Sequence, residues 1–209
     1  MDLSPLQDNA LTTALLFVGA YLGGSISSAI LVCRLFGLPD PRTEGSQNPG
    51  ATNVMRLGGK PAALLTLAGD VLKGVIPVLV ARWLELGPLI AALAGFFAFL
   101  GHLLPVFFQF RGGKGVATAF GLLFALHWLT GIGTGLTWLL VFGITRISSL
   151  ASMISFVLMP LFIWLWLPET LPAMALLSAV LLGRHHSNIR KLLAGEELGF
   201  RKRDSHDDA

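Results

Sequence analysis

Charged residues are scarce in this chain of 209 residues, making up 13% of the sequence against 54% for hydrophobic residues. Soluble domains carry about 25% charged residues, so the composition excludes a water-soluble domain. Several apolar runs reach about 18 residues or more with at most one charge, close to the ~20 that a helix needs to cross a membrane. These runs are continuous rather than alternating, which argues against a membrane β-barrel. The sequence therefore predicts an all-α, polytopic integral membrane helical bundle.

Cysteine is nearly absent, since Cys33 is the only one and lies inside an apolar run. A single cysteine excludes a disulfide framework and a cysteine-cluster metal site. No carboxylate–histidine cluster has the spacing of metal ligands, so we expect neither a metal nor a cofactor. The net charge of +3 comes from scattered basic residues, which argues against a nucleic-acid partner.

The apolar runs predict about seven transmembrane helices within a single membrane-embedded domain, residues 1–209, that ends in a polar tail, 198–209. Helices are expected because backbone amides in lipid must be satisfied within the segment. Glycines 131, 133 and 135 mark the junction of the fourth and fifth runs. Merging that pair would give six spans, and treating it as two re-entrant segments would give five. The seven ranges are 11–35, 61–83, 88–108, 115–128, 131–146, 148–167 and 171–185.

The distribution of basic residues sets the predicted orientation. With seven or five spans, 13 of the 15 basic residues lie toward one side of the membrane, and the positive-inside rule makes that side cytoplasmic. The N-terminus is then outside and the C-terminus is in the cytoplasm. Six spans would export the basic C-terminus, so seven is the preferred number. The 13 residues are Arg34, Arg42, Arg56, Lys60, Arg111, Lys114, Arg146, Arg184, Arg190, Lys191, Arg201, Lys202 and Arg203.

Three polar segments on the predicted cytoplasmic side could carry chemistry. Residues 38–56 are rich in glycine, hydroxyls and amides, which can converge on an anion or simply form a solvated loop. Residues 110–115 place three glycines around Lys114 at the start of a helix, which suits phosphate. The alternative is a tight connection with snorkelling cations.

The third polar segment, 184–197, contains His185 and Asn188. Their spacing of three puts both on one face of a helix. Histidine titrates near neutrality and can act as a base, an acid or a cation, although an interfacial histidine can also be merely solvated.

Asp70 and Lys73 lie inside the second apolar run, again three residues apart. Charges within a membrane are costly and usually pair, so we expect a structural ion pair that lines an internal polar pocket. His102 is expected in the wall of that pocket, and helix packing alone is the other interpretation.

Together these segments resemble the PlsY-type acyl-phosphate:glycerol-3-phosphate acyltransferases over almost the whole chain. The first matching motif contains Gly24-Ser25-Ile26, Asp40-Pro41-Arg42 and Gly45 through Arg56. The second runs from Gly101-His102 to Pro105 and then through Gly112-Gly113-Lys114-Gly115. The third comprises His185, Asn188-Ile189, Gly195 and Glu197. Gln47 stands where the family usually has glycine, which matters if the backbone there has a positive φ.

The resemblance implies transfer of a fatty acyl group from acyl phosphate to the sn-1 hydroxyl of glycerol 3-phosphate, the first acylation step of phospholipid synthesis. It also implies a bacterial cytoplasmic (inner) membrane protein whose active site faces the cytoplasm. Partners would be acyl phosphate, glycerol 3-phosphate, membrane lipid and the peripheral enzyme that makes acyl phosphate. We expect His185 and Asn188 to be catalytic. The expected substrate-binding residues are Ser25, Arg42, Ser46, Asn48, Thr52, Asn53, Arg56, Gly112, Gly113, Lys114, Gly115 and Ser148.

Two alternatives to this function remain open at the level of sequence. The same acceptor could receive its acyl group from acyl-CoA or acyl-carrier protein, although no histidine at 102, 127, 185 or 186 has an acid five residues on, as His-x4-Asp acyltransferases require. No Ser-His-Asp nucleophile signature is present either. A transporter of a phosphorylated metabolite would also want broken helices and an intramembrane ion pair.

Overall fold

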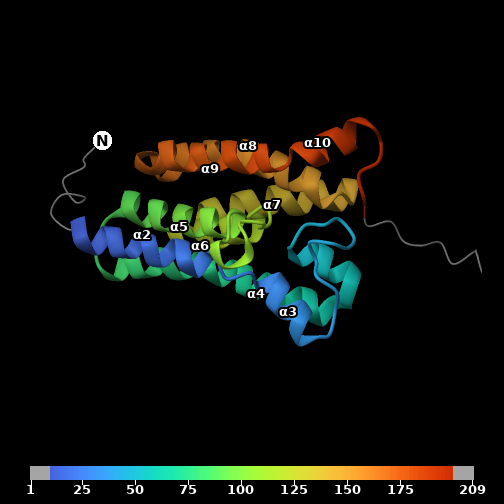
Figure 1. Ribbon diagram of the computed structural model, residues 1–209. Coiled ribbons are helices and arrows are strands. Elements are labelled where there is room, and N and C mark those ends of the chain that lie inside the picture. Colours follow the sequence, from blue (N-terminus) through green and yellow to red (C-terminus); the bar gives the residue numbers. More distant parts are fainter. Residues whose placement is uncertain (1–9, 200–209) are drawn as a thin grey trace, which may run out of the picture.

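A computed structural model describes residues 10–199, and every regular element in that range is a helix (Figure 1). This confirms the all-α prediction for the described part. Residues 1–9 and 200–209 lie outside it, and with them most of the predicted tail, 198–209. The helices are α2 (Ala10–Gly24), α3 (Ser28–Leu35), α4 (Ala51–Trp83), α5 (Pro88–Leu103), α6 (Val116–Leu126), α7 (Trp128–Thr145), α8 (Ser148–Trp166), α9 (Leu171–Arg184) and α10 (His186–Leu193), with 3₁₀ turns η1 (Val106–Phe108) and η2 (Pro168–Thr170).

Five segments of the described chain are long and apolar enough to cross a membrane. Helices α6 and α9, at the places of the fourth and seventh predicted spans, have 11 and 14 residues. At 1.5 Å per residue they are about 17 and 21 Å long, shorter than the ~30 Å hydrocarbon core. The five segments are Ala10–Leu35, Ala51–Trp83, Pro88–Phe108, Trp128–Thr145 and Ser148–Trp166.

The first predicted span, 11–35, coincides with the candidate span Ala10–Leu35, but the prediction of one continuous helix there is wrong. The chain unwinds between Gly24 and Ser28, where Ser27 caps the new helix with its Oγ 3.5 Å from the amide of Ile30. Glycine permits the break to lie against α5, because a Cβ on Gly24 would overlap the carbonyl oxygen of Ala98. Small residues of this kind let two membrane helices approach backbone to backbone.

The second predicted span, 61–83, begins earlier than expected. Helix α4 starts at Ala51 and kinks at Gly59, whose φ of 72° and ψ of −168° are not helical. Pro61 follows the kink, where its missing N–H breaks the helical hydrogen-bond ladder. The polar stretch 51–58 is therefore a helical turn set at an angle to the span, and not a loop.

The junction between the fourth and fifth predicted spans lies at His127 rather than at the glycines 131–135. Gly131 and Gly133 are inside α7, where they face the rings of Phe124 and Phe162. Glycine in a membrane helix can serve close packing rather than a turn, and for this reason the junction was predicted at the wrong place.

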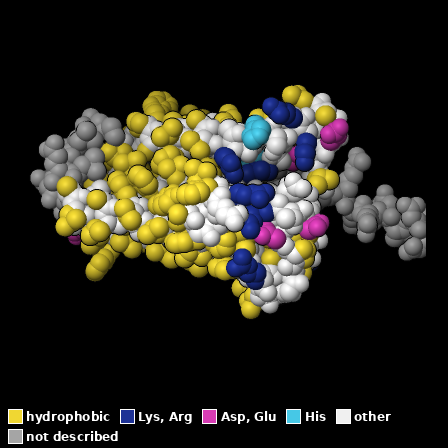
Figure 2. Space-filling model, viewed as in Figure 1, with side chains coloured by type: hydrophobic (Ala, Val, Ile, Leu, Met, Phe, Trp, Pro, Cys, Tyr) yellow, Lys and Arg dark blue, Asp and Glu magenta, His cyan; other side chains and the backbone are white. Residues whose placement is uncertain are grey.

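The interior of the bundle is apolar and centres on α5. Its Ala91, Ala94 and Phe99 are fully buried between α4, α6 and α9. Large hydrophobic side chains also cover the outside of the helical body (Figure 2). Lys and Arg gather instead in a band across one end, as expected for a helical body in lipid with one polar end in water (Figure 2).

Candidate active site

The three polar segments converge at the basic end of the bundle. The loop between α3 and α4 and the helix α10 lie at the same end of the ribbon (Figure 1). Arg184 joins the third segment to the second, because its Nη2 donates to the carbonyl oxygens of Gly112 and Gly113, both at 3.1 Å. The backbone thus assembles one polar region from segments that are far apart in sequence.

Asn53 organises the loop before α4. Its Nδ2 donates to the carbonyl oxygens of Pro41 at 2.9 Å and Glu44 at 3.0 Å, and its Oδ1 accepts from the amide of Ser46 at 2.9 Å. The side chain is 0% exposed. We expected Asn53 to bind substrate, but its amide is occupied in shaping the loop that carries the other polar groups.

Arg42 ties this loop to the glycine segment. Its Nη2 lies 2.7 Å from Oδ2 of Asp40, and its Nη1 donates to the carbonyl oxygen of Phe108 at 3.2 Å. The hydrogen bond from Arg42 is the main cause of a lowered pKa for the Asp40 carboxyl. The pair therefore stays ionised at neutral pH and fixes the guanidinium between the two loops.

The segment before α6 packs so closely against the end of α5 that it requires glycine. A Cβ on Gly113 would overlap Nε2 of His102, and the amide of Gly113 donates to the carbonyl oxygen of His102 at 3.2 Å. Gly115 has a φ of 79° and immediately precedes α6, a left-handed conformation that glycine adopts without strain. The segment is held tightly against the end of α5.

Lys114 lies among several charged groups. The pKa of this ammonium group is lowered to about 8, mainly by burial and also by the nearby cations Lys191, Arg184 and Arg56, while Glu197 acts in the opposite direction. Lys114 is therefore a cation at neutral pH that titrates unusually low. A partly desolvated ammonium group of this kind gains strongly from an anionic ligand.

His185 lies between α9 and α10, outside the five candidate spans, and is 1% exposed. Its Nδ1 is 2.8 Å from the carbonyl oxygen of Leu181, so Nδ1 carries the proton and Nε2 is the basic nitrogen of the neutral ring. Burial lowers its pKa to about 4, helped by the positive charges of Lys114 and Arg184. The imidazole is thus neutral at pH 7 and can accept a proton.

Asn188 is clamped by a carboxylate. Oε1 of Glu197 accepts from Nδ2 of Asn188 at 2.6 Å and from Oγ of Ser149 at 2.5 Å. Oδ1 of Asn188 is buried and has no hydrogen-bond partner among the described residues. The clamp therefore leaves one fixed, unoccupied acceptor three residues from His185.

The other predicted polar residues surround this cluster. Oγ1 of Thr52 is 3.4 Å from Oγ of Ser148, which joins the start of α4 to the start of α8. Arg56 donates to the carbonyl oxygen of Leu198 at 3.2 Å. Ser46 and Asn48 lie in the loop that Asn53 shapes, with their side chains partly buried.

Ser25 and the intramembrane ion pair are in the interior. The hydroxyl of Ser25 is taken by the carbonyl oxygen of Tyr21 at 2.8 Å, which indicates a packing role at the helix break. Nζ of Lys73 is 2.8 Å from Oδ1 of Asp70 and donates to the carbonyl oxygen of Ile26 at 3.2 Å. Nδ1 of His102 lies 3.6 Å from the same carboxylate oxygen. These groups join the break in the first span to α4 and α5.

Two important residues escaped the sequence-based selection. Arg184 attracted notice only as one of the basic residues, and Glu197 only as part of a motif. Both are single charged residues in a segment that already contained His185, and this adjacency was the available signal. Within residues 10–199 no group of three His, Cys, Asp or Glu side chains is placed to hold a metal ion.

Comparisons with known proteins agree with this arrangement. The model of the glycerol-3-phosphate acyltransferase family matches residues 14–195. The glycerol-3-phosphate acyltransferase of Methylococcus capsulatus is 55% identical over 88% of this chain and 93% of its own length. That of Photobacterium profundum is 52% identical, over 88% of this chain and 90% of its own length.

Solved structures give the same assignment. The crystal structure of PlsY (YgiH), an integral membrane glycerol 3-phosphate acyltransferase, in its glycerol 3-phosphate form, matches with a TM-score of 0.87 and 38% identity, covering 91% of this chain and 96% of that one. Its lysophosphatidic acid form matches with a TM-score of 0.84 and 36% identity over the same shares. This chain, with its several apolar helices, therefore belongs to the glycerol-3-phosphate acyltransferase family and is an integral membrane enzyme of the PlsY type.

Proposed function

We propose that the enzyme transfers a fatty acyl group from acyl phosphate to the sn-1 hydroxyl of glycerol 3-phosphate. The bond between the acyl carbon and the phosphate oxygen breaks, and an ester bond to the glycerol oxygen forms. Phosphate leaves with the bonding electrons, and the hydroxyl proton passes to a base. Lysophosphatidic acid and inorganic phosphate are the products.

The observation that carries this proposal is the meeting of Lys114, His185 and Asn188 at one end of the bundle. Acyl phosphate is an activated mixed anhydride, so the protein need supply no covalent nucleophile. It must instead hold two phosphates, stabilise the oxyanion and deprotonate a hydroxyl. These needs are met by the ammonium group of Lys114, whose pKa is lowered, by Nε2 of the neutral His185, and by the amide oxygen of Asn188, which has no partner among the described residues.

We assign roles to the predicted residues accordingly. Gly112, Gly113, Lys114 and Gly115 hold the donor head group and the oxyanion. Asn188 orients the glycerol hydroxyl, and His185 takes its proton through Nε2. A phosphate oxygen of the donor is the other candidate base. The groups that hold the phosphate and glycerol oxygens of the acceptor are Arg42, Ser46, Asn48, Thr52, Arg56 and Ser148, with Asn53 acting through the loop that it shapes.

The experiment that tests the proposal compares three donors on the purified enzyme. Acyl phosphate, acyl-CoA and acyl-carrier protein are supplied in parallel with radiolabelled glycerol 3-phosphate, and the product is identified by its chemistry. Product from acyl phosphate alone, with the acyl group at sn-1, supports the proposal. Faster product formation from either of the other donors, or acylation at sn-2, contradicts it.

The surroundings of the enzyme follow from the same chemistry. A bacterial inner membrane, with the basic end in the cytoplasm, supplies glycerol 3-phosphate from the aqueous side. Acyl phosphate would reach the site from a peripheral enzyme that makes it at the same surface. The basic band at one end of the body is the feature that favours this placement (Figure 2).

A further inference from the structure

His102 lies between the intramembrane ion pair and the glycine segment, residues 110–115. It is in the last turn of α5 and is 7% exposed. Nδ1 of its imidazole is 3.6 Å from Oδ1 of Asp70, and the same oxygen is 2.8 Å from Nζ of Lys73. Nε2 lies against Gly113, where an added Cβ would overlap it. One ring therefore reaches both the ion pair and the glycine segment.

The carboxylate of Asp70 determines which nitrogen of His102 carries the proton. Nδ1 is buried and makes no hydrogen bond within residues 10–199, and 3.6 Å is slightly longer than such a bond. An ionised carboxylate accepts hydrogen bonds and donates none, so the neutral ring is favoured with its proton on Nδ1. Nε2 then presents its lone pair to the glycine segment. The ring cannot turn over without placing that lone pair against the carboxylate.

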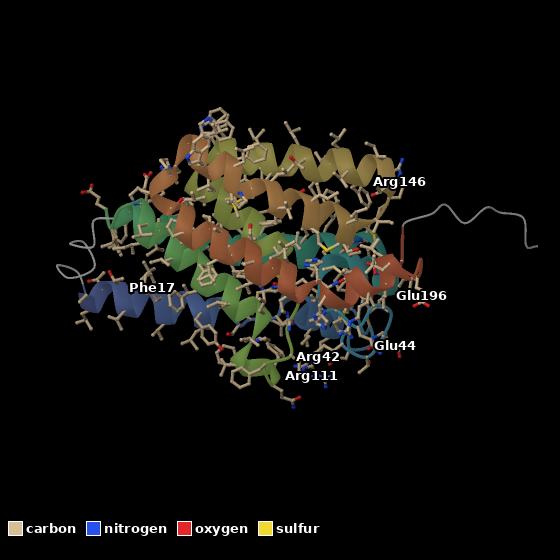
Figure 3. The ribbon with its side chains drawn as sticks, turned by 90° about the horizontal axis from the view of Figure 1, so that it is seen from above. Phe17, Arg42, Glu44, Arg111, Arg146 and Glu196 are labelled. Atoms are coloured by element: carbon tan, nitrogen blue, oxygen red, sulfur yellow. The ribbon has the colours of Figure 1, made fainter. Side chains whose placement is uncertain are left out.

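The glycine segment is held from three directions, and His102 supplies the support from inside the bundle. Arg42 ties the segment to the loop before α4, on the side where Arg42 and Arg111 lie next to one another (Figure 3). Arg184 donates to two of its carbonyl oxygens. From the interior, the carbonyl oxygen of His102 accepts from the amide of Gly113 at 3.2 Å, and the ring of His102 packs against the same residue.

The position of Lys114 depends on this support, because Lys114 directly follows Gly113. A ring that turned or shifted would displace Gly113, since the contact leaves no space even for a Cβ. A misplacement of about 1 Å can lower the rate of a reaction about 100-fold. The orientation of a side chain inside the bundle therefore bears on the chemistry at its polar end.

We propose that His102 is a positioning residue for the reaction: the carboxylate of Asp70 orients its imidazole, and the imidazole keeps Gly113 and Lys114 in place. The inference rests on the proposed function, in which Lys114 holds the donor head group. It gives the ion pair a second role besides stability. The ion pair acts on turnover through His102, and neither touches a substrate.

Two variants and a matched control test this role. His102→Asn keeps a polar group near the place of Nδ1 but ends short of Gly113. The double variant Asp70→Leu/Lys73→Met removes the carboxylate and leaves no unpaired charge. The control is His127→Asn, because Nδ1 of His127 is also buried without a partner in the described chain, but the residue lies at the junction of α6 and α7.

Initial rates are measured across neutral and alkaline pH, and Tm is recorded for each purified variant. Because burial is the main cause of the lowered pKa of Lys114, a displaced and more solvated ammonium group titrates at higher pH. We expect both test variants to lower kcat/KM for acyl phosphate at least about tenfold at neutral pH, as misplacement of a reacting group does. They should also move the alkaline fall in activity upward from about pH 8. The charged groups around Lys114 are unaltered in all these variants, namely Lys191, Arg184, Arg56 and Glu197.

Combining the two test variants should cost no more than about twofold beyond the larger single effect, because both act through one ring. His127→Asn should leave the rate and the pH profile unchanged. A lower rate with the wild-type pH profile would show that His102 only supports the fold, and would overturn the proposal. So would losses that multiply in the combined variant, or an equal effect of His127→Asn.

The proposed function and the positioning role fail in different ways. If wild-type enzyme does not use acyl phosphate, the proposed function itself fails, and the pH profile is then measured with the donor that the enzyme does use. If it uses acyl phosphate and His102→Asn keeps the wild-type rate, only the positioning role fails. A flat wild-type profile removes Lys114 from the reaction, and the positioning role with it.

Discussion

His185 is oriented by the helix from which it emerges. Its Nδ1–H donates to the carbonyl oxygen of Leu181, so Nε2 is the nitrogen that can accept a proton. General base catalysis typically contributes about 10²- to 10⁴-fold. We therefore expect His185→Ala to lower kcat by at least about 100-fold, measured as initial rates at saturating substrates.

The neighbouring His186 provides the control for this variant, because it is exposed and follows directly in sequence. His186→Ala should retain wild-type turnover. Both variants should keep the Tm of the wild type within a few degrees. A rate for His185→Ala within threefold of wild type would remove His185 from the reaction.

The low pKa of Lys114 predicts that activity falls at alkaline pH. Its pKa of about 8 means that the cation is present below pH 8 and is lost as the pH rises through that value. Because the neutral amine binds phosphate poorly, kcat/KM for the donor should fall about tenfold per pH unit above this point. Lys114→Arg should extend the plateau, since arginine stays protonated. A wild-type profile that is flat from pH 7 to 9.5 would contradict this role.

Gln47 adopts the conformation that its usual glycine counterpart would favour. Its φ is 57°, in the left-handed region that costs other residues about 1–2 kcal/mol. Gln47→Gly should therefore leave activity intact and raise the free energy of unfolding by up to about 1 kcal/mol. Glu44→Gly, at a residue of the same loop without a positive φ, should lower it. Thermal unfolding of both variants decides the matter, and a destabilised Gln47→Gly would show that the loop is not strained.

Composition and motif spacing at the residue scale selected His185, Asn188 and Lys114, but could not tell ligands from supports. Asn53 belongs to the same motif as its neighbours, yet its amide is fully used inside the loop. Glu197 was quoted only as part of a motif, and its role in holding Asn188 and Ser149 depends on contacts that the sequence does not show. Such roles depend on side-chain partners distant in sequence.

Helix α4 contains a buried ion pair, and we expect the loss of one charge to destabilise the protein more than the loss of both. Asp70 and Lys73 are both nearly inaccessible and lie 2.8 Å apart. Breaking a buried pair by removing one partner typically costs about 3–5 kcal/mol, whereas replacing both with apolar residues costs far less. Asp70→Asn and Lys73→Met should each lower Tm strongly in detergent. The double variant Asp70→Leu/Lys73→Met should recover most of the loss, and a double variant as unstable as the singles would contradict this account.

The positions of helices were predicted well where apolar runs were long and uniform. Helix α8 occupies Ser148–Trp166, nearly the predicted 148–167. The errors lie at glycines, because a glycine that turns the chain and a glycine that packs two helices look alike in sequence. Gly59 kinks α4, whereas Gly131 lies in the middle of α7 against Phe124. Tertiary neighbours decide between the two uses.

The orientation of the whole molecule is a further prediction. The chain has one native cysteine, Cys33, so a Cys33→Ala background allows single cysteines to be placed at either end. Ser187 is exposed at the basic end, and Glu169 is exposed in the turn η2 between α8 and α9. In intact spheroplasts a membrane-impermeant maleimide should label Glu169→Cys at once and Ser187→Cys only after lysis. The reverse pattern would invert the proposed topology.

The apolar body and the basic end divide the two substrates between two phases (Figure 2). Under the proposed chemistry, the acceptor diffuses in three dimensions and the donor in two. The relevant amount of donor is then its mole fraction in the leaflet, so diluting the bilayer with inert lipid at constant bulk concentration should slow turnover. A cell that adds phospholipid to its membrane without adding acyl phosphate would lower the mole fraction of the donor and so slow this acylation.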